Sequence, residues 1–143
     1  MPVSFETIVV GQSYSRQELA GLWGYGGVEA ISRGVVTPRD DNKIILFVTR
    51  EKRPADTQYE DELVGDVLLW EGPNDHFAEE RMLQHRHSED EIHLFYRDLH
   101  RDEFTYVGQL LLYCRERRAD SPSRFVFRTA SGVIDPTSEC HFL

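Results

Sequence analysis

The chain has 143 residues, of which 40% are hydrophobic and 11% are aromatic. This size and composition are those of one folded domain and not of a disordered chain. Its formal charge of −9 at pH 7 excludes broad nonspecific attraction to nucleic acid, because that attraction comes mainly from Lys and Arg that neutralise phosphates. No apolar run reaches the roughly 18 residues needed to cross a bilayer, and the chain does not begin with a signal-peptide pattern, so we expect one cytoplasmic domain over residues 1–143 with no membrane partner.

The N-terminal part predicts a short strand or extended arm followed by a short helix. Residues 5–10 are rich in β-forming side chains. Ser15, followed three residues later by Glu18, is a capping-box pattern, which predicts a helix that begins there and ends before a glycine-rich loop. Three apolar side chains fall on one side of this helix, at the spacing i, i+3 and i+4: Leu19, Leu22 and Trp23.

Strand patterns dominate the rest of the chain. Residues 44–49 are the most continuous β-branched and aromatic run, and they follow a turn cluster, so we expect a central buried strand there. Further strand candidates, each next to turn-forming residues, are 34–37, 64–70, 92–97, 104–113 and 124–128. A second short helix is predicted over 77–83, and residues 130–143 read as a peripheral tail. The sequence thus predicts an α+β domain, an open or closed β-barrel of five or six main strands with one or two short helices.

Groups that could carry catalysis or bind a metal are present but not in a recognisable pattern. Histidines and carboxylates gather around His85, His87 and His93, and such side chains are ordinary ligands of zinc or manganese. Their spacing matches no closed metal site, and charged runs usually lie in solvent. The chain also has no Gly-x-Ser-x-Gly elbow and no Walker-type phosphate loop. We therefore predict a protein that is not an enzyme and that carries no metal and no cofactor.

Polar-tipped aromatic side chains and arginines occur together at several points of the chain. Such groups can stack on a nucleobase and contact a phosphate, although about half or more of the aromatics are expected to be simple core residues. The combinations that suggest a nucleic-acid site contain the following residues: Tyr14, Arg16, Tyr59, Asp61, Trp70 and Arg97.

Seven short segments follow one another in an order and spacing that carries more information than any one of them. They are Tyr14-Ser-Arg16-Gln-Glu-Leu19, Gly34-Val35, Ile45-Leu-Phe-Val-Thr-Arg-Glu-Lys52, Tyr59-Glu-Asp61, Leu69-Trp70-Glu71-Gly72, His93-Leu-Phe-Tyr-Arg97 and Phe104-Thr-Tyr106-Val-Gly108. Together they span roughly residues 11–115 and resemble the domain of unknown function 3427, a family usually met at the C-terminus of helicase-containing, restriction-like proteins.

The resemblance implies a PUA/SRA-like β-barrel that recognises modified DNA, such as DNA with cytosine methylated at carbon 5, by flipping the base into a pocket. A flipped base needs an aromatic face, an acceptor for its exocyclic amine and a niche for the methyl group. Tyr59 fits the stacking role, Asp61 fits the reading of the base edge, and Arg16 or Arg97 would hold phosphate. Because relatives carry nuclease and helicase segments and this chain holds only the reader, a separate nuclease or helicase is an implied partner beside DNA.

Two functions remain open on the sequence. The first is a modified-DNA recognition module that acts by base flipping in a restriction or phage-defence context. The alternative is a protein-interaction or regulatory module of the same fold, whose acidic surface docks on a basic partner, as the net charge of −9 would allow. A positive, aromatic-rimmed concavity would favour the first function, whereas uniformly negative walls would favour the second.

Overall fold

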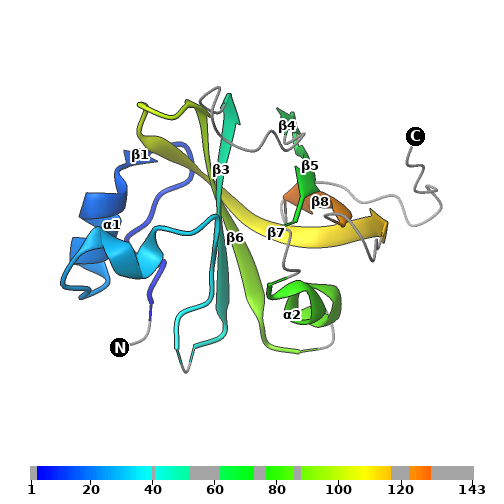
Figure 1. The fold of residues 1–143 in the computed structure, drawn as a ribbon, viewed down its shortest axis with the longest axis horizontal. Coiled ribbons are helices and arrows are strands. Elements are labelled where there is room, and N and C mark those ends of the chain that lie inside the picture. The colour runs from blue at the N-terminus through cyan, green and yellow to red at the C-terminus, as the bar shows by residue number, and fades with distance from the viewer. Residues whose placement is uncertain are drawn as a thin grey trace.

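The computed structural model describes residues 3–39, 41–51, 62–72, 77–85, 88–116 and 123–129. In these residues one sheet of eight strands is accompanied by short helices (Figure 1). The elements in chain order are β1 (Ser13–Tyr14), α1 (Arg16–Leu22), the 3-10 helix η1 (Val28–Ile31), β2 (Val35–Val36), β3 (Lys43–Glu51), β4 (Glu62–Val64), β5 (Val67–Glu71), α2 (Glu79–Gln84), β6 (Glu91–Leu99), β7 (Phe104–Glu116) and β8 (Arg124–Thr129). None of the helices in the described residues is long and apolar enough to cross a membrane.

The strand order across the sheet is β2-β3-β6-β7-β8-β5-β4, and β1 pairs with one end of β7. The β3 and β6 strands run parallel, with Ile44 opposite Ile92, whereas the other neighbouring strands are antiparallel. Parallel neighbours need a long crossover connection. Here the crossover from β3 to β6 contains β4, β5 and α2.

Strand β3 confirms the prediction of a central buried strand. Its residues 44–48 are at most 5% exposed. Ile45 and Phe47 point into a first core, on the side of the sheet that α1 and η1 cover, whereas the three residues that alternate with them point into a second core. A run without polar alternation is what a strand buried on both faces requires.

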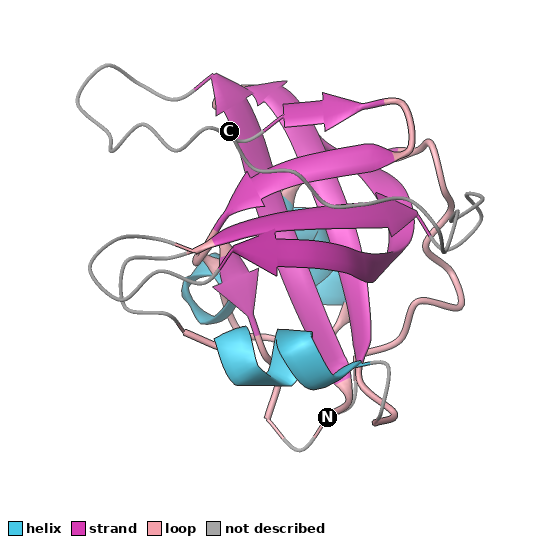
Figure 2. Ribbon diagram, turned by 90° about the vertical axis from the view of Figure 1, so that its right-hand side faces the viewer, coloured by secondary structure: helices cyan, strands magenta, loops and turns pink. Residues whose placement is uncertain are grey.

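The sheet curls around the second core. Leu68 and Trp70 of β5 and Phe127 of β8 belong to the same buried cluster as Leu46 of β3, although three strands separate β3 from β5 in the strand order. Figure 2 shows the strands wrapped in this way, with one helix in front of them and others behind. Within the described residues β2 and β4, the two ends of the order, are not paired with each other, so the sheet is open there and closure of the expected barrel is not observed.

The 13-residue strand β7 joins the two halves of the sheet. Its first part pairs with β1 and β6, and its last part pairs with β8. The register shifts between Leu94 and Phe95 on β6 and again between Leu112 and Cys114 on β7, and such bulges bend a strand. Gly108, at the first bulge, has a φ of +131°, a value that side chains other than glycine rarely adopt.

Two predicted segments differ from the structure. Residues 5–10 form turns, with the amide of Ile8 donating to the Phe5 carbonyl at 3.2 Å, because the apolar residues of this segment do not alternate between core and solvent. Residues 64–70 are not one strand: β4 ends at Val64, residues 65–66 form the turn of a hairpin, and β5 begins at Val67 opposite Val64, so the predicted strand is confirmed only over residues 67–70. The intervening Gly-Asp pair is a known hairpin signal. Residues 130–143, the predicted tail, lie outside the described residues.

Candidate nucleic-acid interface

The first turn of α1 fixes the position of Arg16. The hydroxyl of Ser15 accepts the amide hydrogen of Glu18 at 3.0 Å, and the Glu18 carboxylate accepts the amide hydrogen of Ser15 at 3.2 Å. This is the predicted capping box, which satisfies two backbone donors at once. Arg16 is the first helical residue, so its place follows from a local sequence pattern.

The rest of α1 anchors the helix to the first core. Leu19 is fully buried and Trp23 is 4% exposed, with the indole Nε1 donating to the Ser4 carbonyl at 3.0 Å. Leu22 is 57% exposed, so the prediction that it shares the buried side is wrong. Ala20 is buried in its place, and a seven-residue helix presents too few turns to bury a wider stripe.

Two guanidinium groups lie against aromatic rings at the edge of the first core, and they share the ring of Phe104. The Cζ atom of Arg16 is 4.7 Å from the ring centroid of Phe47 and 5.0 Å from that of Phe104. The Cζ atom of Arg97 is 4.1 Å from the Phe104 centroid. Cations are attracted to aromatic faces at such distances. We call Arg16 and Arg97 the arginine pair.

Hydrogen bonds orient both members of the pair. The Nε of Arg97 donates to the hydroxyl of Thr49 at 2.8 Å, which the parallel register places opposite Arg97, and its Nη1 donates to the Asp102 carbonyl at 3.2 Å. The Nη2 of Arg16 donates to the Arg33 carbonyl at 3.4 Å. The Nε of Arg16 is buried without a hydrogen-bond partner, and no ion pair joins Arg16 to a carboxylate of the described residues.

The electrostatics of the pair favour an anion. Burial, and to a smaller extent repulsion from Arg97, lowers the pKa of Arg16 to about 10, so the group stays protonated at neutral pH. An anion that binds between the two guanidinium groups would reduce the repulsion between them. Guanidinium groups also match the geometry of phosphate oxygens, because they donate two parallel hydrogen bonds. The arrangement is therefore suited to hold a phosphate group.

The other predicted site residues are not all in this place. Tyr14 lies next to the pair, opposite Phe104 in the β1–β7 ladder, but it is 8% exposed and its hydroxyl accepts the Val9 amide hydrogen at 3.0 Å. Trp70 is in the second core, 6% exposed and 5.4 Å from the Phe125 ring centroid, so it does not share a site with the arginine pair. Tyr59 and Asp61 lie outside the described residues, so their base-reading roles stay predictions.

His93, one histidine of the suspected metal-binding region, belongs to a polar cluster under the N-terminal segment. The Nδ1 of His93 lies 2.7 Å from the Tyr106 hydroxyl, and its Nε2 lies 2.9 Å from a carboxylate oxygen of Glu91. The Phe5 ring stacks on the imidazole, with centroids 3.8 Å apart and planes 9° apart. His85 instead accepts the Leu112 amide hydrogen at 3.0 Å. In the described ranges no three or more His, Cys, Asp or Glu side chains form a group that could hold a metal ion.

Comparison with known proteins shows a similarity of structure and not of sequence. Neither a protein-family model nor a curated protein sequence matches the chain. Among solved structures, the fold is similar to that of the DNA modification-dependent restriction endonuclease AspBHI, with a TM-score of 0.52. The two share 13% sequence identity, and the match covers 95% of this chain and 83% of that chain. At this identity the similarity establishes a shared fold.

Proposed function

We propose that the protein is a DNA-recognition module of restriction or defence type, which reads a modified base and does not cut DNA itself. The observation that carries the proposal is the arginine pair, two cations held on aromatic rings with an orphaned Nε on Arg16. The fold similarity to AspBHI, a restriction endonuclease whose name states its dependence on DNA modification, supports the same reading.

The pair supplies what an acidic protein needs in order to approach DNA. With a net charge of −9 the molecule as a whole repels the duplex, so contact has to be made at a local cationic point. Phosphate contacts set the register of a protein on the duplex, and base contacts give the specificity. In this proposal Arg16 and Arg97 make the phosphate contacts, while Tyr59 and Asp61 remain candidates for contacts to the base.

The direct test is a binding titration with three duplexes that differ only in one cytosine, which carries a methyl group, a hydroxymethyl group or no substituent. We expect tighter binding to one modified duplex than to the plain one, measured at a stated low salt concentration because phosphate contacts weaken steeply with salt. Equal binding to all three duplexes would contradict the proposal that the protein distinguishes a modified cytosine from a plain one. No binding to any of them would favour the alternative module with an acidic docking surface.

Variants of the arginine pair test whether Arg16 and Arg97 make the phosphate contacts that the titration detects. Arg16→Ala and Arg97→Ala should each weaken binding to every duplex by a similar factor and reduce the slope of log affinity against log salt by about one. Arg124→Ala is the matched control, because that arginine lies on β8 beside Glu71, 3.8 Å between Nε and the carboxylate, on a strand that does not touch the first core. Equal salt slopes for the parent and both pair variants would contradict the phosphate role.

A further inference from the structure

A row of side chains on three strands points away from the second core. Leu69 of β5 is opposite Val126 of β8, and Val126 is opposite Cys114 of β7. Residues directly opposite each other in antiparallel strands lie on the same face of the sheet, so these three side chains form one row. Their neighbours Leu68 and Phe127 are buried in the second core, so the row lies on the outer face of the sheet.

The outer face is apolar and accessible around this row. Val64 is opposite Val67 in the hairpin of β4 and β5, and Val67 is two residues from Leu69, so all three side chains share the face. Leu69 is 42% exposed and Val64 is 58% exposed. We call Val64, Val67, Leu69 and Val126 the apolar patch. Apolar side chains that are exposed together indicate a surface that another segment or molecule covers.

Cys114, at the end of the row, is disulfide-bonded. The chain has two cysteines, and the other is Cys140, so Cys140 is the partner that one chain can supply. It belongs to residues 130–143, which lie outside the described residues. The bond fixes where this segment meets the sheet, because Cys114 is opposite Val126 of the apolar patch.

The segment after β8 is long enough to turn back over the sheet. Cys140 is eleven residues beyond Thr129, the last residue of β8, and an extended chain of that length spans up to about 36–40 Å. Thr129 is opposite Leu110, which lies four residues before Cys114 on β7 and hence about 13 Å from it along the strand. The connection therefore reaches Cys114 with length to spare for crossing β8 and β5.

The composition of residues 130–143 complements the outer face. Their apolar side chains are those of Val133, Ile134, Phe142 and Leu143. The segment also has Asp135 and Glu139 but no Lys or Arg, so its side chains carry a charge of −2. Arg124 and Arg128 lie on the outer face, because they alternate with phenylalanines of the second core, and Arg124 is beside Glu71. A negative segment is attracted to a face that carries these arginines.

We propose that residues 130–143 form a strap over the apolar patch, that a disulfide between Cys114 and Cys140 closes the strap, and that reduction of this bond releases it. Reduction breaks the S–S bond and takes up two electrons and two protons, which a dithiol supplies as it becomes a disulfide itself. Cys114 is partly exposed, so a thiol can reach the bond. The strap is independent of the DNA function proposed above, because the arginine pair lies at the first core.

The first experiment locates the bond. The protein is equilibrated in glutathione buffers from fully reduced to fully oxidised, its thiols are blocked, and its peptides are mapped by mass spectrometry without reduction. We expect the oxidised protein to be a monomer with a peptide pair that joins Cys114 to Cys140. A bond between two chains would mean that a second copy covers the patch. That result, or two blocked thiols in the most oxidising buffer, would overturn the proposal.

The second experiment measures whether the strap covers the patch. A photoactivated carbene reagent labels accessible side chains, and mass spectrometry locates the label. We expect the label on the peptide that holds Val64 and Leu69 to rise about twofold or more when dithiothreitol reduces the protein, since labelling follows the exposed apolar area. Cys140→Ser should be labelled like the reduced parent in every buffer, and Ser138→Ala, which keeps both cysteines, like the parent. Equal labelling of the oxidised and reduced parent would contradict the strap.

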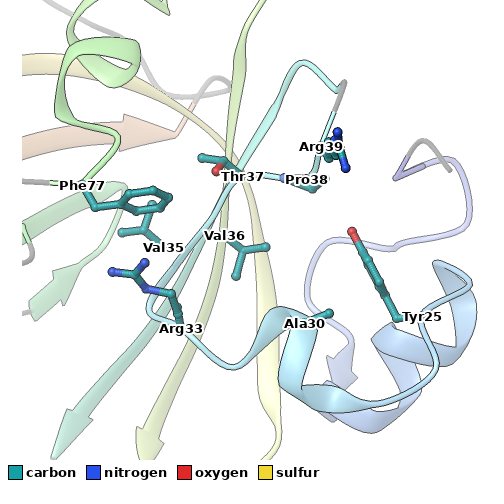
Figure 3. A pocket seen from close by; sticks show the side chains of 9 residues that line it. All are labelled: Tyr25, Ala30, Arg33, Val35, Val36, Thr37, Pro38, Arg39 and Phe77. Carbon is teal, nitrogen blue, oxygen red and sulfur yellow. The ribbon is translucent and has the colours of Figure 1, made fainter.

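Two other surfaces are internal references whose labelling should not change on reduction. Leu22 is 57% exposed on α1, which lies on the other side of the molecule from β5 (Figure 1). An open pocket of about 240 Å³ lies between Tyr25, Val36 and Phe77 (Figure 3). A rise at both references together with the patch would show that reduction loosens the whole protein, and the strap proposal would then be wrong.

The third experiment separates docking of the strap from the bond alone. Contact with the patch holds Cys140 near Cys114 and raises the effective concentration of the two thiols. Leu69→Asp should therefore lower the ratio [GSH]²/[GSSG] at which half of the bond forms by about fivefold, because a carboxylate there weakens the apolar contact. Leu22→Asp, at an exposed position on α1, should keep the ratio of the parent. The same ratio for all three proteins would show a tether that does not dock, which refutes the proposal.

Discussion

The side chain of His93 is a buried neutral imidazole whose two nitrogens have different partners. The carboxylate of Glu91 can only accept, so Nε2 carries the hydrogen and donates to it. The Tyr106 hydroxyl then donates to Nδ1. Burial lowers the pKa of His93, against the opposing effect of Glu91, and burial together with Glu91 raises the pKa of Tyr106 to about 12. Both groups are thus held in the neutral state at pH 7.

Removing the hydroxyl of this cluster should destabilise the fold. In Tyr106→Phe the Nδ1 of His93 loses its donor in a site that is 4% exposed, and an unsatisfied buried polar atom costs about 1–3 kcal/mol. The free energy of unfolding, measured by urea denaturation, should fall by that amount. Tyr25→Phe, which removes a more accessible hydroxyl, is the control and should change stability by less than about 0.5 kcal/mol. Equal stability of the two variants would show that the hydrogen bond contributes nothing net.

The same cluster predicts a dependence of stability on pH. Because the folded-state pKa of His93 lies below its ordinary value of 6.5, the unfolded chain binds the proton more readily. This contribution to stability is complete above pH 6.5 and is lost as the pH falls from 6.5 toward the lowered pKa. The unfolding midpoint should therefore drop between pH 7 and pH 5, and His93→Gln should flatten that drop. A parallel pH profile for the parent and the variant would contradict this assignment.

Single residues of the site were predictable only where a local pattern carries them. Arg16 follows from the capping box that starts α1. The rings that support it do not, because Phe47 and Phe104 come from strands that meet only through the arrangement of the sheet. The sequence around Trp70 does not distinguish an aromatic residue of the second core from one at a site; the structure places Trp70 in the second core, and its role in binding stays a prediction.

Helix α1 shows how one element carries both stability and site geometry. Its capping box should be worth about 1 kcal/mol, so Ser15→Ala should lower the free energy of unfolding by that amount. The same variant should weaken DNA binding if the first turn positions Arg16. Ser15→Asp keeps an acceptor for the Glu18 amide and should restore both properties, as measured by denaturation and by titration. Loss of binding in Ser15→Asp with full stability would mean that local charge, not the cap, affects the DNA contact.

Elements with strong local signals were predicted well, and their pairing was not. The strand over 44–49, the strands near 92–97, 104–113 and 124–128, and the helix near 77–83 all appear close to their predicted positions. The parallel pairing of β3 with β6 and the pairing of β6 with β7 depend on contacts between residues that are distant in the sequence. A pattern of neighbours along the chain does not encode such contacts.

The molecule as a whole is expected to bind DNA without cleaving it. The sequence shows no ligand set with a recognisable metal spacing. Purified protein with added magnesium or manganese should leave a modified duplex intact, and elemental analysis should find less than one zinc per chain. Cleavage that is absent from a mock preparation and is lost in Asp61→Asn or Glu91→Gln would show that the chain is a nuclease after all.

The parallel pairing of β3 with β6 has a consequence for how the chain reaches its structure. Ile44 and Ile92 face each other across a separation of 48 residues, and both lie in the second core. Contacts between distant residues slow folding, because the loop entropy is lost before the contact forms. During synthesis β3 cannot form this pairing until β6 has left the ribosome, so the part of the second core that β6 contributes is missing over that interval. This interval is when the nascent chain is most prone to aggregate, and when a chaperone would have most effect.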